Sequence, residues 1–307
     1  MPASPVSGQR LCQTHAAPAA PAAPAASIRR QLCVALLAAG AVLWAQPALA
    51  DLARIRQNGS LKVAVYKGLP PFSAVAGSQY DGIDVALARA LASELGVSVS
   101  LLPFDADENM SDDLRSMVWR GHYLGYGPAD VMLHVPVDRA FMRANDKALI
   151  FAPYYRETFV LVRDRERVPD LRSLDDLAGQ PAGAAAGSAG ANALLSGAGG
   201  ALRDKVKIYP EAGQALRALF AGEIAAAMVT RAQYESALQA AGQSAARFAT
   251  ADVSSPLLPS RGWAIGMAIK AGDKELAQSL ENALDALRRK GELARIFAGY
   301  GVTMQEP

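Results

Sequence analysis

A short apolar run constrains the fold of this chain most. Residues 131–135, Val-Met-Leu-His-Val, lie between two prolines, and such runs are typical of strands buried in a mostly parallel sheet. Ligands bind just beyond the carboxyl ends of the strands in these sheets. His134, Asp138 and Arg139 lie at that end. They form either a ligand site or an ordinary helix start, with Asp138 in the first turn and Arg139 in a surface ion pair.

The first fifty residues predict a secretory signal peptide. Arg29 and Arg30 precede the apolar run 32–45, which is followed by the small-x-small sequence Ala-Leu-Ala at 48–50. The run is too short for a lasting membrane span. We therefore expect export to the periplasm, with cleavage near Ala50-Asp51.

Cysteine use and charge exclude two classes of function. The two cysteines lie in the leader, so the exported chain has no disulfide and no thiol chemistry. Without the leader's Arg10, Arg29 and Arg30, the 31 basic residues become 28 against 29 acidic ones, a net charge of −1. This balance argues against nucleic acid as a partner.

The order of the predicted elements indicates an α/β fold. A strand at 61–66, an amphipathic helix at 83–95 and a strand at 97–104 predict a β-α-β unit. A second α/β unit is predicted at 179–234. A late strand at 263–269 and two amphipathic helices at 273–300 follow.

The acidic stretch 105–113 has the alternate spacing of a calcium loop but lacks its essential residues. Met110 stands where a glycine allows the sharp turn, and Ser116 stands where a bidentate glutamate is needed. We therefore predict a helix start capped by Ser111, and no metal site.

The loop 119–128 is dense in aromatic residues and glycine. Loops of this composition often carry recognition, because Trp and Tyr combine a large contact area with a polar group. The alternative is a loop whose aromatic residues pack into the core.

No residue pattern in the chain selects a catalytic centre. After the leader only His122 and His134 remain as histidines, and their spacing does not suit a metal site. The chain also lacks a Gly-x-Ser-x-Gly elbow, a phosphate-binding loop and a complete dinucleotide fingerprint. We therefore expect a binding protein without a cofactor rather than an enzyme.

Several motifs, taken in order, resemble family 3 of the bacterial periplasmic solute-binding proteins, the amino-acid receptors of ABC transporters. They are Leu-Lys-Val-Ala-Val at 61–65, Pro-Phe at 71–72, Gly-Ile-Asp-Val-Ala-Leu-Ala at 82–88, Ala-Asp-Val-Met at 129–132, Phe-Ala-Pro-Tyr-Tyr at 151–155 and Ala-Gly-Glu-Ile-Ala-Ala-Ala at 221–227. The resemblance implies a two-lobed (type II) fold with a two-strand hinge and a central ligand cleft. Lobe one is then expected at 51–156 plus 261–307 and lobe two at 157–260, with hinge closure.

The resemblance also implies a ligand site. Arg139 stands where the family binds the ligand carboxylate, and Ser188 matches an anion-binding turn. His134 replaces a family serine, and Thr230 replaces the aspartate that holds the ligand ammonium. The aromatic residue that stacks on the ligand is Leu69 here, so Tyr66 or Phe72 is expected to substitute for it. Because a buried ammonium needs a counter-charge, these departures favour a small anionic organic solute over an ordinary amino acid.

The resemblance leaves three functions open. The first is solute capture by a monomer that serves an ABC permease in the inner membrane. The second is a partner or maturation role for a periplasmic quinoprotein (PQQ-dependent) alcohol or methanol dehydrogenase, because the insert 120–128 resembles variants encoded beside such enzymes. The third is a lyase on the same fold, as in cyclohexadienyl dehydratases.

Overall fold

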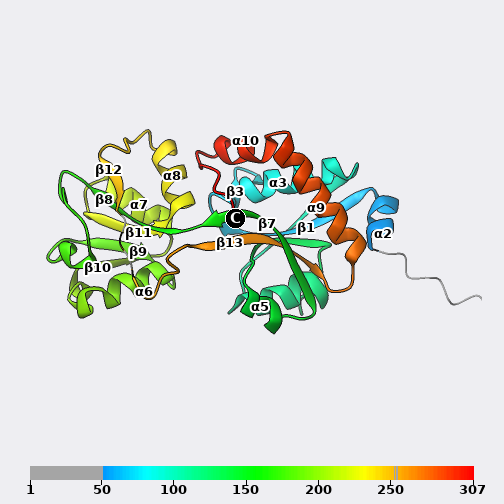
Figure 1. The fold of residues 1–307 in the computed structure, drawn as a ribbon, viewed down its shortest axis with the longest axis horizontal. Coiled ribbons are helices and arrows are strands. Elements are labelled where there is room, and N and C mark those ends of the chain that lie inside the picture. The colour runs from blue at the N-terminus through cyan, green and yellow to red at the C-terminus, as the bar shows by residue number, and fades with distance from the viewer. Residues whose placement is uncertain (1–50, 252, 254) are drawn as a thin grey trace, which may run out of the picture. The chain divides into compact units, whose positions relative to one another are not determined.

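The structure is a computed structural model that describes residues 51–307 except 252 and 254. The predicted signal peptide, residues 1–50, lies outside the described residues. In the part that is described, no helix is both long and apolar enough to cross a membrane. The prediction of an α/β fold is confirmed, because helices cover both faces of two five-stranded sheets (Figure 1).

The first sheet contains the apolar run that suggested a buried strand. Its strand order is β5 (Ser98–Phe104), β1 (Ser60–Tyr66), β6 (Val131–Pro136), β13 (Trp263–Lys270) and β7 (Ala148–Glu157). Strand β1 pairs in parallel with both β5 and β6, whereas β13 is antiparallel to β6 and β7. A small antiparallel sheet of β2 (Gly68–Leu69), β3 (Ser73–Ala76) and β4 (Gln79–Asp81) follows β1.

Helices cover the two faces of the first sheet with separate apolar cores. One face carries α2 (Asp51–Asn58), α3 (Ile83–Glu94), α9 (Lys274–Arg289) and α10 (Glu292–Gly299). The other face carries α4 (Met110–Leu114), the π-helical turn η1 (Arg115–Trp119) and α5 (Arg139–Ala144). Asn109, rather than the predicted Ser111, caps α4, because its side chain accepts hydrogen bonds from the backbone N–H groups of Ser111 and Asp112.

The second sheet has its own pair of cores. Its strand order is β10 (Val206–Tyr209), β9 (Ala182–Ala185), β11 (Ala226–Thr230), β8 (Phe159–Asp164) and β12 (Phe248–Ala251). Helix α6 (Ala189–Ser196) and the short turns η2 (Leu174–Leu177), η3 (Gly197–Gly200) and η4 (Arg203–Lys205) belong to one side. Helices α7 (Ala212–Phe220) and α8 (Arg231–Ala240) cover the other side.

Two chain segments connect the two sheets. The first crosses directly from β7 to β8 through Thr158, and the second returns from β12 to β13. Trp263 at the start of β13 pairs with Glu157 at the end of β7, so the two segments touch at this point. The preceding residue, Gly262, has a φ of +64°, and a Cβ atom on it would lie only 1.9 Å from the carbonyl oxygen of Glu157. Only glycine fits so close to the opposing backbone.

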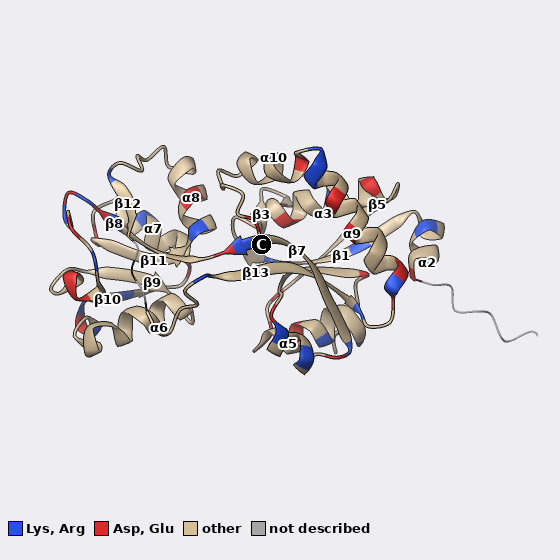
Figure 2. Ribbon diagram, viewed as in Figure 1, with Lys and Arg blue, Asp and Glu red and all other residues tan. Residues whose placement is uncertain are grey.

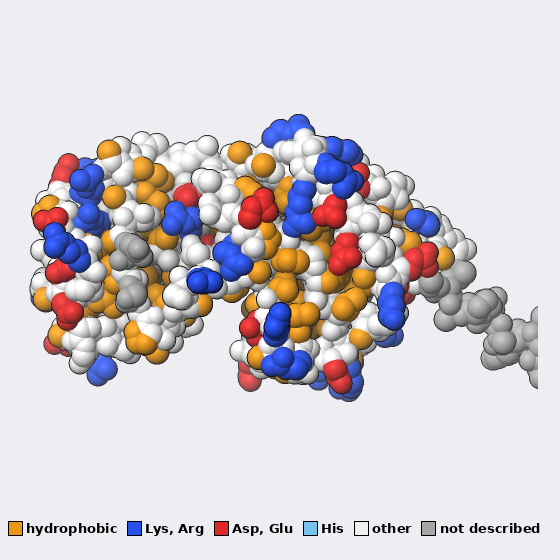
Figure 3. Space-filling view, viewed as in Figure 1, with side chains coloured by type: hydrophobic (Ala, Val, Ile, Leu, Met, Phe, Trp, Pro, Cys, Tyr) orange, Lys and Arg blue, Asp and Glu red, His pale blue; other side chains and the backbone are white. Residues whose placement is uncertain are grey.

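The charged residues of α9 and α10 lie on the outer faces of these helices. Helix α9 buries Leu276, Leu280, Leu284 and Leu287 and places acidic and basic residues on its other face (Figure 2). The space-filling view shows these charged side chains over α9 and α10 (Figure 3). Acidic and basic residues are interspersed there, as expected for helices with one solvated face.

Candidate functional site

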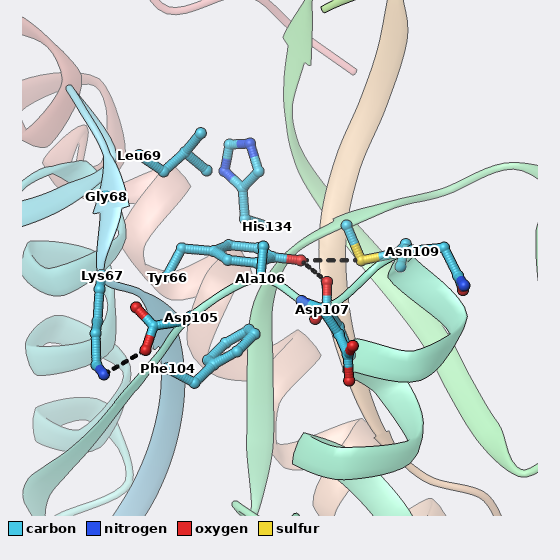
Figure 4. Close-up of a pocket in the computed structure, with 12 residues that line it drawn as sticks. Tyr66, Lys67, Gly68, Leu69, Phe104, Asp105, Ala106, Asp107, Asn109 and His134 are labelled. Atoms are coloured by element: carbon cyan, nitrogen blue, oxygen red, sulfur yellow. Dashed lines mark hydrogen bonds and ion pairs between the residues drawn. The ribbon is translucent and has the colours of Figure 1, made fainter. Parts of the chain in front are cut away.

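A cavity of about 550 Å³ opens at the end of β1, where the chain leaves the first sheet. Its walls come from the loop after β1, the segment from the end of β5 into α4, and the end of β6 (Figure 4). The lining residues are Tyr66, Lys67, Gly68, Leu69, Phe104, Asp105, Ala106, Asp107, Asn109, Met110, Asp113 and His134. This is the edge at which parallel strands are expected to hold a ligand.

Tyr66 forms the centre of the cavity wall. Its ring lies between those of Phe104 and His134, with centroids 4.5 Å and 6.5 Å away (Figure 4). Its hydroxyl donates a hydrogen bond to Asp113 Oδ2 at 2.7 Å, and burial together with this carboxylate raises the pKa of Tyr66 well above its ordinary value. Tyr66 is therefore a neutral donor fixed to an acidic partner.

Acidic groups dominate the charge of the cavity. Asp105, Asp107 and Asp113 line it, against a single basic residue, Lys67, whose ammonium lies 2.7 Å from Asp105 Oδ2. Burial raises the pKa of Asp113, while hydrogen bonds from the Asp107 N–H and the Tyr66 hydroxyl oppose this rise. The cavity therefore favours a positively charged group over a negatively charged one.

His134 lies at the cavity wall and is held from behind by a buried carboxylate. Its Nδ1 atom is 3.1 Å from Asp84 Oδ2, and the Asp84 side chain is only 2% exposed. The hydroxyl of the fully buried Tyr154 donates to Asp84 Oδ1 at 2.7 Å and accepts the backbone N–H of His134 at 3.0 Å. His134 itself has a φ of 63°, which is unusual for a residue other than glycine. The Phe72 and His134 rings pack in an edge-type arrangement, with centroids 4.3 Å apart.

The structure brings together three of the six predicted ligand residues. Tyr66 and His134 line the cavity, and Phe72 is buried directly behind His134. Arg139 is exposed at the start of α5, where Asp138 caps the helix by accepting N–H groups from Ala140 and Phe141. Arg139 is not among the residues that line the cavity.

The other two predicted residues start helices of the second sheet. Ser188 caps α6 by accepting the N–H of Ala191 at 3.0 Å, and Thr230 caps α8 in a capping box with Gln233. Neither residue lines the cavity at the first sheet. Their hydroxyl groups therefore satisfy helix ends in the described structure.

A second buried carboxylate, Glu157, lies where the chain crosses between the sheets. Its residue is 2% exposed, and its Oε1 accepts the N–H of Thr158 at 3.0 Å and of Ala232 at 3.5 Å. Among the described residues its Oε2 has no hydrogen-bond partner. Burial raises the pKa of Glu157 to about 7, although these N–H donors act in the opposite direction.

Sequence reasoning missed Asp84, Glu157 and the three aspartates of the cavity. One signal was available for Asp84, because this acid stands between Ile83 and Val85 on a helix whose first turn is otherwise apolar. The sequence marks Asp105, Asp107 and Asp113 as an acidic stretch but indicates only a helix start there. For Glu157 the sequence offers no comparable signal.

The fold of the chain matches solved structures, although its sequence matches no known family. No protein-family model and no curated protein matches the sequence. An ancestral cationic amino acid solute binding protein matches with a TM-score of 0.64 and 20% identity, over 82% of this chain and 99% of the other. An amino acid ABC transporter substrate-binding protein from Streptococcus pneumoniae, bound to L-arginine, matches with a TM-score of 0.58 and 20% identity, over 84% and 100%.

A third solved structure, a polar amino acid ABC uptake transporter substrate binding protein from Streptococcus thermophilus, has a TM-score of 0.59 and 20% identity. The match covers 82% of this chain and 90% of the Streptococcus thermophilus protein. These matches confirm the predicted two-lobed architecture around the two sheets described above. The chain therefore has the two-lobed α/β fold of the amino-acid-binding proteins of ABC transporters.

Proposed function

We propose that the protein is a periplasmic solute-binding protein that captures a small organic solute for an ABC-type importer. The cavity beside Tyr66 and His134 carries this proposal, because it combines an aromatic wall with fixed polar groups at the strand ends of the first sheet. The shared fold of solute-binding proteins supports it. The solute then passes to a permease in the inner membrane.

The charges of the cavity further favour a solute with a positively charged group. The sequence led us to expect an anion bound by Arg139, but Arg139 is exposed outside the cavity lining, while three aspartates lie within that lining. The Tyr66 ring and the thioether of Met110, which both line the cavity, suit the apolar part of such a solute. A thermal-shift screen that compares L-arginine, its neutral analogue citrulline and dicarboxylates tests this class. A solute at 100 times its Kd adds about 2.7 kcal/mol of stability.

Two charge-changing variants are expected to shift the Kd for L-arginine in opposite directions. Asp107→Asn removes a negative charge from the lining and should weaken binding, whereas Lys67→Met removes the single basic residue and should tighten it. Each change is worth about 0.5–1 kcal/mol, or roughly a 2- to 5-fold change in Kd, for a charge near the cavity mouth. Isothermal titration calorimetry measures both.

The same variants separate the two solute classes. An anionic solute held by Arg139 would show the reverse order for Asp107→Asn and Lys67→Met. It would also lose about 2–5 kcal/mol of binding free energy in Arg139→Ala if a buried charge pair is broken. For a cationic solute in this cavity, Arg139→Ala should leave the Kd within about twofold.

A second candidate function, as partner of a quinoprotein alcohol dehydrogenase, is favoured by the loop Gly121–Gly127. Tyr123 and Leu124 at its tip are 86% and 67% exposed. The loop is internally bonded, because the His122 N–H donates to the Tyr126 carbonyl at 2.8 Å and the two rings stack 4.3 Å apart. A pre-organised loop that exposes two large apolar side chains suits a protein interface.

Replacing both tip residues with serine is expected to abolish this association. Exported wild-type protein should retain a quinoprotein dehydrogenase in a pull-down, and Tyr123→Ser/Leu124→Ser should reduce the retained amount at least tenfold. The matched control is Ile208→Ser/Leu257→Ser, which alters two exposed apolar residues elsewhere. Failure of the wild-type protein to retain the dehydrogenase would contradict this second function.

A further inference from the structure

The imidazole of His134 is fixed on one edge and open on the other. Nδ1 faces Asp84 Oδ2, and the Phe72 ring packs against the imidazole. The side chain is still 15% exposed, because it forms part of the cavity wall (Figure 4). Among the described residues, Nε2 has no hydrogen-bond partner and is not a buried atom.

The hydrogen bonds around Asp84 indicate that Nδ1 of His134 carries a hydrogen. The Tyr154 oxygen accepts the His134 backbone N–H, so its single hydrogen is directed to Asp84 Oδ1. A carboxylate can only accept, and therefore the hydrogen between Oδ2 and Nδ1 must belong to the imidazole. A neutral imidazole has one N–H, which leaves a lone pair on Nε2.

The cavity that His134 lines carries mostly hydrogen-bond acceptors and negative charges. The cavity around His134 contains three aspartates and a basic residue that is already paired with one of them. Asp84 and Tyr154 contact His134 directly, and the Tyr66 ring lies 6.5 Å from the imidazole. The charge of His134 also acts on Glu157, and Lys67, Asp105, Asp107 and Asp113 line the same cavity. A lone pair in such surroundings is complementary to a positively charged N–H donor.

We propose that Asp84 and Tyr154 are positioning residues, which hold His134 so that its Nε2 accepts a hydrogen bond from a cationic N–H group of the solute. This proposal rests on the proposed solute-binding function and assigns the recognition of the cation to one atom. A His134 that merely filled the core would need neither the left-handed backbone nor an open ring edge at the cavity.

The protein contains an internal control for the tautomer of His134. His122, the other histidine of the described chain, accepts the backbone N–H of Leu124 on its Nδ1 at 3.2 Å. Its hydrogen must therefore lie on Nε2, opposite to the tautomer assigned to His134. Two-bond ¹H–¹⁵N correlation spectra of the ligand-free protein at pH 8 distinguish the two, and a His122→Gln variant assigns the signals. A protonated Nε2 on His134 overturns the proposal.

Asp84→Asn is expected to invert the tautomer. Tyr154 donates to the side-chain oxygen of position 84, so the amide NH₂ of the asparagine would face Nδ1 and donate to it. Nε2 would then carry the hydrogen and repel a cationic donor. We expect at least a tenfold rise in the Kd for L-arginine, a smaller rise for citrulline, and a visible exchange of the His134 nitrogen signals.

Titration of the wild-type protein with L-arginine completes the test and does not depend on any variant folding. The Nε2 resonance of His134 should move on binding, while the signals of His122 stay in place. If L-arginine binds and the Nε2 resonance does not move, the role of His134 is overturned and the proposed solute class stands. If no cationic probe binds, the solute class itself fails and the role of Nε2 fails with it, whatever the tautomer.

Discussion

The Glu157→Gln variant is expected to gain stability relative to wild type as the pH rises from 4.5 to 8. Burial raises the pKa of this carboxyl from 4.5 to about 7, so the folded state resists its ionisation. The stability that the neutral carboxyl provides is complete below pH 4.5 and is lost as the pH rises through 7. A difference of this size corresponds to about 3 kcal/mol, and glutamine does not lose it because it does not ionise.

The measurement is the free energy of unfolding in urea at pH 4.5, 6, 7 and 8 for both proteins. The difference between Glu157→Gln and wild type should grow by up to about 3 kcal/mol across this range. Glu223→Gln, at an exposed glutamate, is the matched control and should show a flat difference. A flat difference for Glu157→Gln as well would refute the assignment of a buried, nearly neutral carboxyl.

Gly262→Ala is expected to be the most disruptive small substitution in the connection between the sheets. Its new Cβ would lie 1.9 Å from the Glu157 carbonyl oxygen and 2.6 Å from Thr158 Cγ2, in a backbone with a φ of +64°. The left-handed conformation and the collision together should cost about 2–5 kcal/mol of unfolding free energy. Urea unfolding at constant pH measures the loss.

Gly59→Ala separates the two causes of this loss. Gly59 has the same φ of +64°, but a Cβ atom there would meet nothing within 4 Å. It should therefore lose only about 1–2 kcal/mol, from the left-handed backbone alone. Equal losses in the two variants would mean that the contact between the two connecting segments is unimportant.

Local patterns in the sequence predicted the main buried strands and amphipathic helices, but not the polar contacts of the site. The apolar run 131–135 and the leucine spacing of α3 and α9 each report one buried face, and both are found in the structure. His134 meets Asp84, which is 50 residues away in the sequence. A contact of that range depends on how α3 packs on the sheet, and no local pattern encodes it.

The acidic stretch illustrates the same limit. Asp105 to Asp113 was interpreted as the start of a helix, and α4 does begin there, with Asn109 as its cap. The fold additionally places Asp105, Asp107 and Asp113 in the lining of the cavity that Tyr66 and His134 also line, so this lining carries more acidic than basic residues. For Glu157, burial follows from the pairing of β7 with β13 and from the start of α8. A charged residue that follows an arginine in the sequence gives no hint of this burial.

The pairing of Glu157 with Trp263 also has an evolutionary consequence. The chain leaves the first sheet and re-enters it at neighbouring positions, so the whole segment 158–262 begins and ends at one place. A chain segment whose two ends lie side by side can be exchanged between related proteins without disturbing the fold of the rest of the chain. Recombination at this junction would therefore exchange the segment 158–262 as a unit and keep the His134 cavity intact, because all of its lining residues lie outside that segment.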